Sequence, residues 1–106
     1  MNFNEMNKSL IKNNVLKFIH IDIDPIDMKY NILLSLSDNE DFNDVVSFYF
    51  YDVSNIRMDD IGGGLTQFML LKISIIDISN DRNKYKLEDI EDKKISFEFN
   101  FVDVIK

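Results

Sequence analysis

Apolar and polar residues alternate along much of the chain, a pattern that predicts β-strands. Between residues 17 and 24, three isoleucines at every second position share one face, and a phenylalanine, a histidine and an aspartate share the other. Pro25 should end this strand, because proline cannot donate to a strand ladder. Residues 28–36 repeat the alternation, with an apolar residue at every even position. Residues 17–36 are therefore expected to form two amphipathic strands.

Residues 45–53, VVSFYFYDV, are apolar on both faces and rich in aromatic residues. A strand with two apolar faces is typical of the centre of a sheet. Its two phenylalanines point to one side, and its two tyrosines, Tyr49 and Tyr51, point to the other. Ile56 and Met58 extend this strand or begin a short neighbour.

The C-terminal half contains three further apolar stretches. Residues 65–79 predict one long strand or two short ones, with a helix over 65–71 as the alternative, and residues 85–87 predict a short strand. Residues 95–101 form the clearest alternation, with the four apolar residues, Phe101 included, on one face. After Phe101 the alternation breaks, which indicates a bulge or burial on both faces.

Polar segments separate the strands. Residues 37–44, 80–83 and 88–94 predict solvated turns and loops from their Asn, Asp and Glu content. Gly62–Gly64 lacks the lysine and helix of a phosphate-binding loop, so it predicts a flexible hairpin tip or a bulge at a close backbone approach.

The pattern predicts a mainly β fold, or an α+β fold: a single antiparallel sheet or a compact β-sandwich of about six to seven strands with one or two short helices, arranged as a meander. Residues 1–106 are expected to form a single domain. Within it, residues 1–14 form a short helix, over about 4–12, or a flexible start.

Composition supports the sheet and removes several chemistries. Fifteen isoleucines and no alanine favour strands over helices. The absence of cysteine and the single histidine exclude disulfides, cysteine-based metal centres, a thiol nucleophile and a two-histidine metal site. We therefore expect no cofactor, no metal, no catalytic residue and no enzymatic activity. Asp22 and Asp24 beside His20 are the alternative, a small metal-dependent enzyme, although a solvated strand end explains them as well.

The net charge of −7 argues against direct binding of nucleic acid and favours a basic protein partner. The first residues lack the basic start and apolar run of a signal peptide, and no apolar stretch is long enough to span a bilayer. We therefore expect a cytoplasmic protein without membrane contact.

Acidic residues beside aromatic ones are the candidate partner surface, because tyrosine supplies large contact area at low entropic cost. Four carboxylates surround Phe42 in the loop 38–44, and the Asp pair before the glycines is the second candidate. The candidate partner-binding residues are Glu40, Asp41, Phe42, Asp44, Tyr49, Tyr51, Asp59 and Asp60.

Two segments carry a resemblance: FYDVSNIRMDDIGGGLTQFMLLKISIIDIS at 50–79 and KYKLEDIEDKKISFEFNFVDV at 84–104. They resemble small stand-alone bacterial proteins, some of which accompany polymorphic or contact-dependent-inhibition toxins as immunity proteins. The resemblance implies a non-enzymatic protein that neutralises a toxin by tight binding and brings no catalytic residue. A basic toxin domain, such as a nuclease with a basic cleft, fits the negative charge of this chain. A structural β domain that associates with a second copy is a further alternative.

Overall fold

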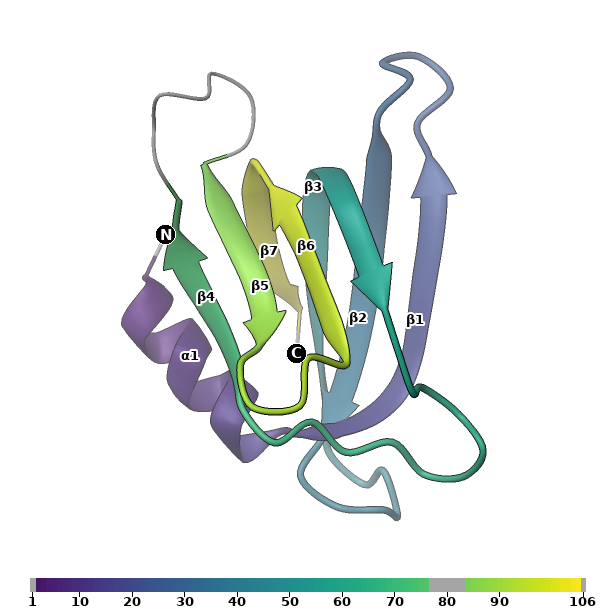
Figure 1. The fold of residues 1–106 in the computed structure, drawn as a ribbon, viewed down its shortest axis with the longest axis vertical. Coiled ribbons are helices and arrows are strands. Elements are labelled where there is room, and N and C mark those ends of the chain that lie inside the picture. The colour runs from purple at the N-terminus through teal and green to yellow at the C-terminus, as the bar shows by residue number, and fades with distance from the viewer. Residues whose placement is uncertain (1, 77–83, 106) are drawn as a thin grey trace.

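The computed structural model describes residues 2–76 and 84–105. Its elements are α1 (Phe3–Lys12), β1 (Val15–Ile23), β2 (Tyr30–Ser37), β3 (Val45–Met58), β4 (Leu71–Ile75), β5 (Tyr85–Asp89), β6 (Ile95–Phe99) and β7 (Phe101–Ile105). The predicted mainly β fold is confirmed: one short helix accompanies seven antiparallel strands (Figure 1). The turn predicted at 80–83 and the end of the apolar stretch, 77–79, lie outside the described residues.

The strand order is β1-β2-β3-β6-β5-β4, and β7 pairs with β3 beside this path. Strands β1-β2-β3 and β4-β5-β6 are each a meander, so the expected meander holds within each run of three but not between them. Residues 45–53 of β3 pair with β2 and, over 47–51, with β7, whereas residues 54–58 pair with β6. One long strand therefore belongs to two layers: a first layer of β1, β2, β3 and β7, and a second layer of β3, β6, β5 and β4.

A bend in β3 allows it to serve both layers. Asp52 and Asn55 take left-handed backbone angles, with φ of 55° and 52°, a region that Asp and Asn tolerate better than most residues. The Asp52 N–H donates to Oδ1 of Asn31 (3.1 Å), and Nδ2 of Asn55 donates to Glu98 (2.6 Å). These contacts hold the bend between the two layers (Figure 1).

The strand that pairs with β3 changes from β6 to β7 at Asn100. This residue separates the two strands and donates its N–H to the Tyr51 carbonyl (3.0 Å). The alternation reverses there, so Phe99 and Val102 are buried while Phe101 is 44% exposed. The prediction that Phe101 shares the core face of residues 95–99 is wrong by this one-residue shift, because the break precedes Phe101.

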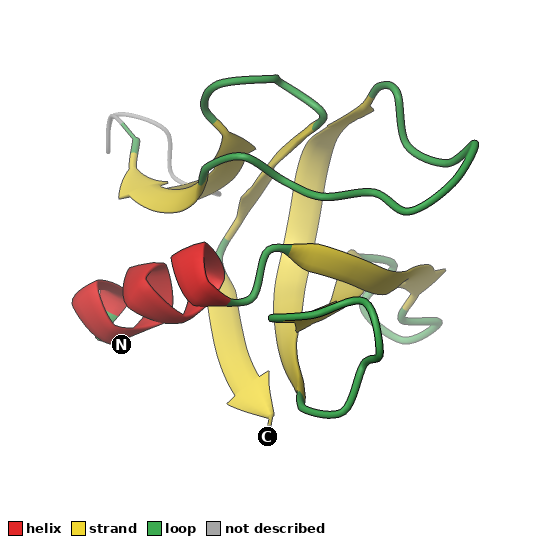
Figure 2. Cartoon of the chain, turned by 90° about the horizontal axis from the view of Figure 1, so that it is seen from below, coloured by secondary structure: helices red, strands yellow, loops and turns green. Residues whose placement is uncertain are grey.

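The core lies between the two layers. The strands β2, β3, β4, β5 and β6 supply most of its largest buried side chains: Ile32, Leu34, Leu36, Phe48, Phe50, Leu71, Ile73, Leu87, Phe97 and Phe99. The predicted N-terminal helix is confirmed as α1, which starts at the Asn2 cap and inserts Leu10 into this core. Seen along the strands, α1 closes one side of the two layers (Figure 2).

The segment before β4 differs from its prediction. Of the described residues 65–76, only Leu71–Ile75 is a strand, and residues 65–70 form neither a strand nor the alternative helix, apart from a single bridge of Gln67 to Val15. Phe68 is fully buried, whereas Leu65 and Met69 are exposed. Phe68 alone of these three anchors the crossing loop in the core. An apolar run in the sequence does not distinguish such a loop from a strand.

The three glycines belong to the same loop. Their φ angles are 102°, 73° and 134°, and a Cβ on any of them would have nothing within 4 Å. The prediction of a close backbone approach is therefore wrong. The prediction of a hairpin tip is also wrong, because the loop joins β3 to β4, which are not neighbours. Backbone angles explain the glycines, because side-chain-bearing residues rarely adopt them.

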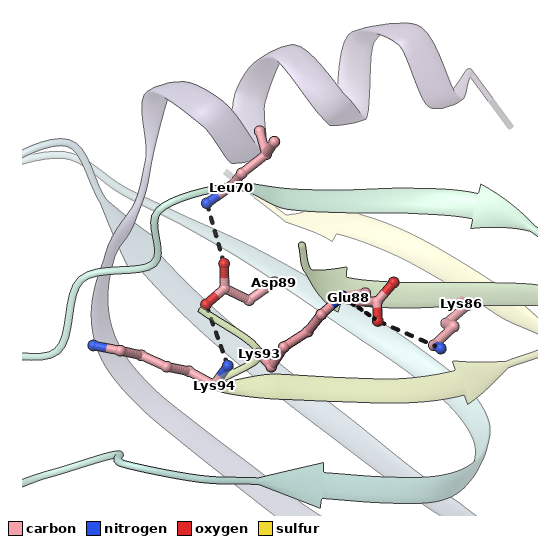
Figure 3. A network of polar contacts seen from close by, with 6 residues as sticks. All are labelled: Leu70, Lys86, Glu88, Asp89, Lys93 and Lys94. Atoms are coloured by element: carbon pink, nitrogen blue, oxygen red, sulfur yellow. Dashed lines mark hydrogen bonds and ion pairs between the residues drawn. The ribbon is translucent and has the colours of Figure 1, made fainter. Parts of the chain in front are cut away.

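Asp89 is the exception to the solvated turn predicted at 88–94, because it is fully buried. Its carboxylate accepts hydrogen bonds from the backbone N–H of Leu70 (3.2 Å) and of Lys94 (3.3 Å), as Figure 3 shows. One side chain thus joins the start of β4 to the turn between β5 and β6.

The break at Asn100 predicts opposite results for two neighbouring phenylalanines. Phe99→Ala should lower the free energy of unfolding by about 3–5 kcal/mol, because it empties a buried site. Phe101→Ala, the matched control, should lower it by about 1 kcal/mol or less. Urea denaturation measures both values, and equal losses would show that the shift is misplaced.

The buried carboxylate predicts a second contrast. Asp89→Ala should cost about 1–3 kcal/mol of stability, because it leaves two backbone N–H groups without their acceptor. Asp92→Ala, on the exposed side of the same turn, should change stability by about 0.5 kcal/mol or less. A small effect at both positions in thermal or urea unfolding would contradict the role of Asp89.

Candidate functional site

The acidic loop between β2 and β3 is ordered by short-range hydrogen bonds. Ser37 Oγ donates to the Asp44 carbonyl (2.9 Å), and the Asp41 N–H donates to Asn39 Oδ1 (3.0 Å). Asp41 and Asp44 are exposed, as is Glu40. Phe42 is half-buried, with φ of 54°.

Asp59 and Asp60 lie at the end of β3, and both are exposed. In Figure 1 the loops 38–44 and 59–70 leave the same, lower end of the molecule, as does the turn 90–94. The two acidic candidate segments therefore lie at the same end of the folded molecule. The tyrosines do not: Tyr49 is five residues along β3 from Asp44, or about 16 Å at the usual strand rise.

Tyr49 and Tyr51 lie on the outer face of the first layer, as the alternation predicted. Their ring centroids are 4.7 Å apart, and the Tyr51 and Phe101 rings are 5.7 Å apart. The Tyr51 hydroxyl donates to Oδ2 of Asp103 (3.1 Å). The structure thus joins the two tyrosines to a phenylalanine and a carboxylate from β7.

Strand pairing extends this cluster across the layer. Residues paired across antiparallel strands share a face, and the pairs run from His20 through Leu33 and Tyr49 to Asp103. The flanking pairs place further apolar residues on the same side. We call the set the aromatic face: Phe18, Leu33, Tyr49, Tyr51, Phe101 and Ile105.

The aromatic face is accessible and carries negative charge. Phe18 and Ile105 are 41% and 51% exposed. The charged residues in its described rows are Asp22 and Asp103, and these rows contain no lysine or arginine. The pKa of Tyr51 lies above its ordinary value, first because of partial burial and then because of its hydrogen bond to Asp103 and the negative charge there. The phenol therefore stays a neutral donor near pH 7.

Of the residues in this site, the sequence pattern predicted only Tyr49 and Tyr51 as candidates. Phe101 and Asp103 follow the break at Asn100, and the sequence places Phe101 on the core face. Phe18 was assigned correctly to the face opposite the isoleucines, but its pairing with the row of Ser35, Ser47 and Ile105 comes only from the sheet.

The outer face of the second layer carries a polar hollow of about 730 Å³. Glu88 lies between Lys86 (3.6 Å) and Lys93 (3.4 Å), as Figure 3 shows. The charged residues that line the hollow are Arg57, Lys86, Lys93, Asp59, Glu88 and Glu98, three of each sign. A hollow whose charges cancel gives no preference for a phosphate or for a cation.

The metal alternative finds little geometric support. His20 Nε2 and Asp22 Oδ2 are 3.4 Å apart in an exposed pair, while Asp24 accepts the Ile26 N–H (2.8 Å) in the following turn. In the described part of the chain, no three histidine, aspartate or glutamate side chains converge to hold a metal ion. Nor does any described helix have the length and apolar character to cross a membrane.

Comparison of the chain with protein-family models, with curated proteins and with solved structures finds no match.

The exposed His20–Asp22 pair predicts weak metal affinity, since two ligands in solvent do not complete a site. Calorimetric titration with Zn²⁺, Mn²⁺ or Ca²⁺ should show no micromolar binding. Micromolar affinity that disappears in the double variant Asp22→Asn with Asp24→Asn would instead support the metal-dependent enzyme.

Proposed function

We propose that this chain is a non-enzymatic binding protein that neutralises a basic toxin domain in the cytoplasm by forming a tight complex. The aromatic face is the observation that carries the proposal. Tyrosine and phenylalanine dominate the energetics of protein interfaces because they bury large areas and lose little conformational freedom. Here Tyr51 and Phe101 are in contact and more than a third exposed.

Charge indicates the chemistry of the partner. The chain carries a net charge of −7, and both Asp22 and Asp103 border the aromatic face. A negative surface attracts a basic partner over long range and raises the association rate. Toxins that cleave nucleic acids need basic clefts for their polyanionic substrate, so a protein that covers such a cleft competes with phosphate.

The acidic end contributes to the same encounter. Glu40, Asp41 and Asp44 lie in one exposed loop, with Asp59 and Asp60 at the same end of the molecule. We assign to these residues a steering role, because solvent-exposed charges influence the association rate more than the final affinity. Residues 50–79 and 84–104 resemble small stand-alone bacterial proteins, some of which are immunity proteins, and this resemblance supports the same function.

Growth rescue tests the proposal. The proteins encoded on either side of this chain's gene are each expressed in a bacterial host, with and without this chain. One of them should arrest growth, and the wild-type chain should relieve the arrest. Asp103→Lys should weaken the rescue, because it places a positive charge in the aromatic face. Glu91→Lys, which makes the same charge change in an exposed turn, is the matched control and should rescue fully.

Binding kinetics of the purified pair separate contact from steering. Reversal of Glu40, Asp41 and Asp44 to lysine should slow association, as added salt does for the wild type. The absence of any neighbour that arrests growth, or an arrest that the wild-type chain does not relieve, would contradict the proposed function.

A further inference from the structure

The sheet edges of this fold are not equally protected. An edge strand presents unpaired backbone N–H and C=O groups, and proteins usually cover or blunt such an edge. At β4 the cover is Asn7 of α1: Oδ1 accepts the Ile73 N–H (2.7 Å), and Nδ2 donates to the Ile73 carbonyl (3.1 Å). The amide side chain thus takes the place of a partner strand.

The edge at β7 is also flanked by α1. A shallow hollow of about 720 Å³ lies between them, lined by Val104 and by α1 side chains such as Met6 and Ser9. The helix therefore occupies the side of the molecule where β4 and β7 end their layers (Figure 2).

The edge of β1 is covered only at its start. The Leu16 N–H donates to the Thr66 carbonyl (2.9 Å), the Phe68 N–H donates to the Asn14 carbonyl (2.8 Å), and the ladder shifts at Lys17. Beyond Lys17, no described strand pairs with the outer edge of β1.

The hydrogen-bond alternation shows which groups this edge presents. The Asp24 N–H donates to the Lys29 carbonyl (2.9 Å). Because hydrogen-bonded pairs alternate along an antiparallel ladder, Asp22 and His20 also form backbone hydrogen bonds with β2. The backbone groups of Ile19, Ile21 and Ile23 then point outward, away from β2. Three outward residues in register are what an added antiparallel or parallel strand requires.

The side chains beside this edge are apolar and exposed on one face, and they include an acidic residue on the other. Ile21 and Ile23 are 40% and 38% exposed on the inner face. The outer face carries Phe18, His20 and Asp22, which continue the aromatic face to the edge. No lysine follows Lys17 within the strand, and the charged residue of 18–23 is Asp22, so this edge does not repel a basic segment.

The second half of β3 follows the bend into the second layer. Residues 54–58 pair with β6, and Val53 is the last residue of β3 that pairs with β2. In Figure 1 this half of β3 and the edge of β1 lie on the same side of the molecule, opposite α1.

From these edges we infer that the partner adds an extended segment as a new strand to β1 at Ile19–Ile23. The segment alternates basic residues, which lie beside Asp22 and the aromatic face, with β-branched apolar residues, which cover Ile21 and Ile23. Backbone bonds supply affinity and alternate side chains supply specificity in this mode of binding. The inference rests on the proposed function and names its recognition mode.

A second copy of this chain is the poorer occupant. Two copies each carry −7, and pairing β1 with β1 would bring both copies of Asp22 and Asp24 into one continuous sheet. Repulsion between these like charges would destabilise such a dimer. A basic segment removes that cost and gains from the same carboxylates.

The probe is a synthetic nonapeptide of alternating lysine and valine, titrated into isotope-labelled protein. Amide shifts should concentrate on β1, at Ile19, Ile21 and Ile23. The same peptide with a central proline should bind about tenfold more weakly, because proline removes a donor. A glutamate–valine peptide should not bind.

Matched variants test the edge in the protein. Ile21→Lys places a charge on the inner side of the free edge and should weaken peptide binding about tenfold. Ile75→Lys is the control: it changes an exposed isoleucine of β4, the strand that Asn7 caps, and should bind as the wild type does. Asp22→Lys should weaken binding, whereas Glu91→Lys should not. Circular dichroism confirms that each variant is folded.

Three outcomes would overturn strand addition: no shifts on β1 at millimolar peptide, equal binding of the proline peptide, or a homodimer in sedimentation that Ile21→Lys dissociates. In the growth assay, full rescue by Ile21→Lys together with impaired rescue by Asp103→Lys would reject the edge and leave the proposed function standing. Failure of the wild-type chain to rescue would reject the proposed function itself.

Discussion

The bend of β3 is the constraint on which the rest of the structure depends. A strand of 14 residues would otherwise carry the sheet on in one direction. Left-handed angles at Asp52 and Asn55 turn it into the second layer, and Asn100 lets β6 and β7 follow it. The two layers enclose the phenylalanine core, and α1 closes only one side. Because none of the described strands returns to β1, the opposite side keeps a free edge next to an accessible aromatic face.

Sequence patterns predicted the parts of this fold that alternate between core and solvent. The strands before residue 53 follow from that alternation, as does the placement of Tyr49 and Tyr51 opposite the phenylalanines. Positions that depend on distant segments could not be predicted. Phe101 changes face because β3 bends, Phe68 is buried by a loop that crosses between layers, and Asp89 is buried because N–H groups from two other segments satisfy its carboxylate. In the sequence, nothing distinguishes these three residues from the similar residues beside them.

The candidate site divides in the same way. Acidic composition predicted the charged loops, and these loops lie at one end of the molecule. The tyrosines acquire their partners, Phe101 and Asp103, only through the pairing of β3 with β7. The aromatic face then runs across β2 to Phe18 on β1, where the free edge begins. We therefore propose that one partner lies on the face and extends the sheet at its edge, while the acidic end raises the rate of encounter.

Backbone amide exchange in the free protein tests the open edge most directly, because it needs no partner. Along β1, amides that bond to β2 should exchange slowly, and amides that point outward should exchange rapidly. The account predicts fast exchange at Ile19, Ile21 and Ile23, with protection at His20 and Asp22. Uniform protection from residue 19 to residue 23 would show that another segment or a second copy already covers the edge, and would contradict the account.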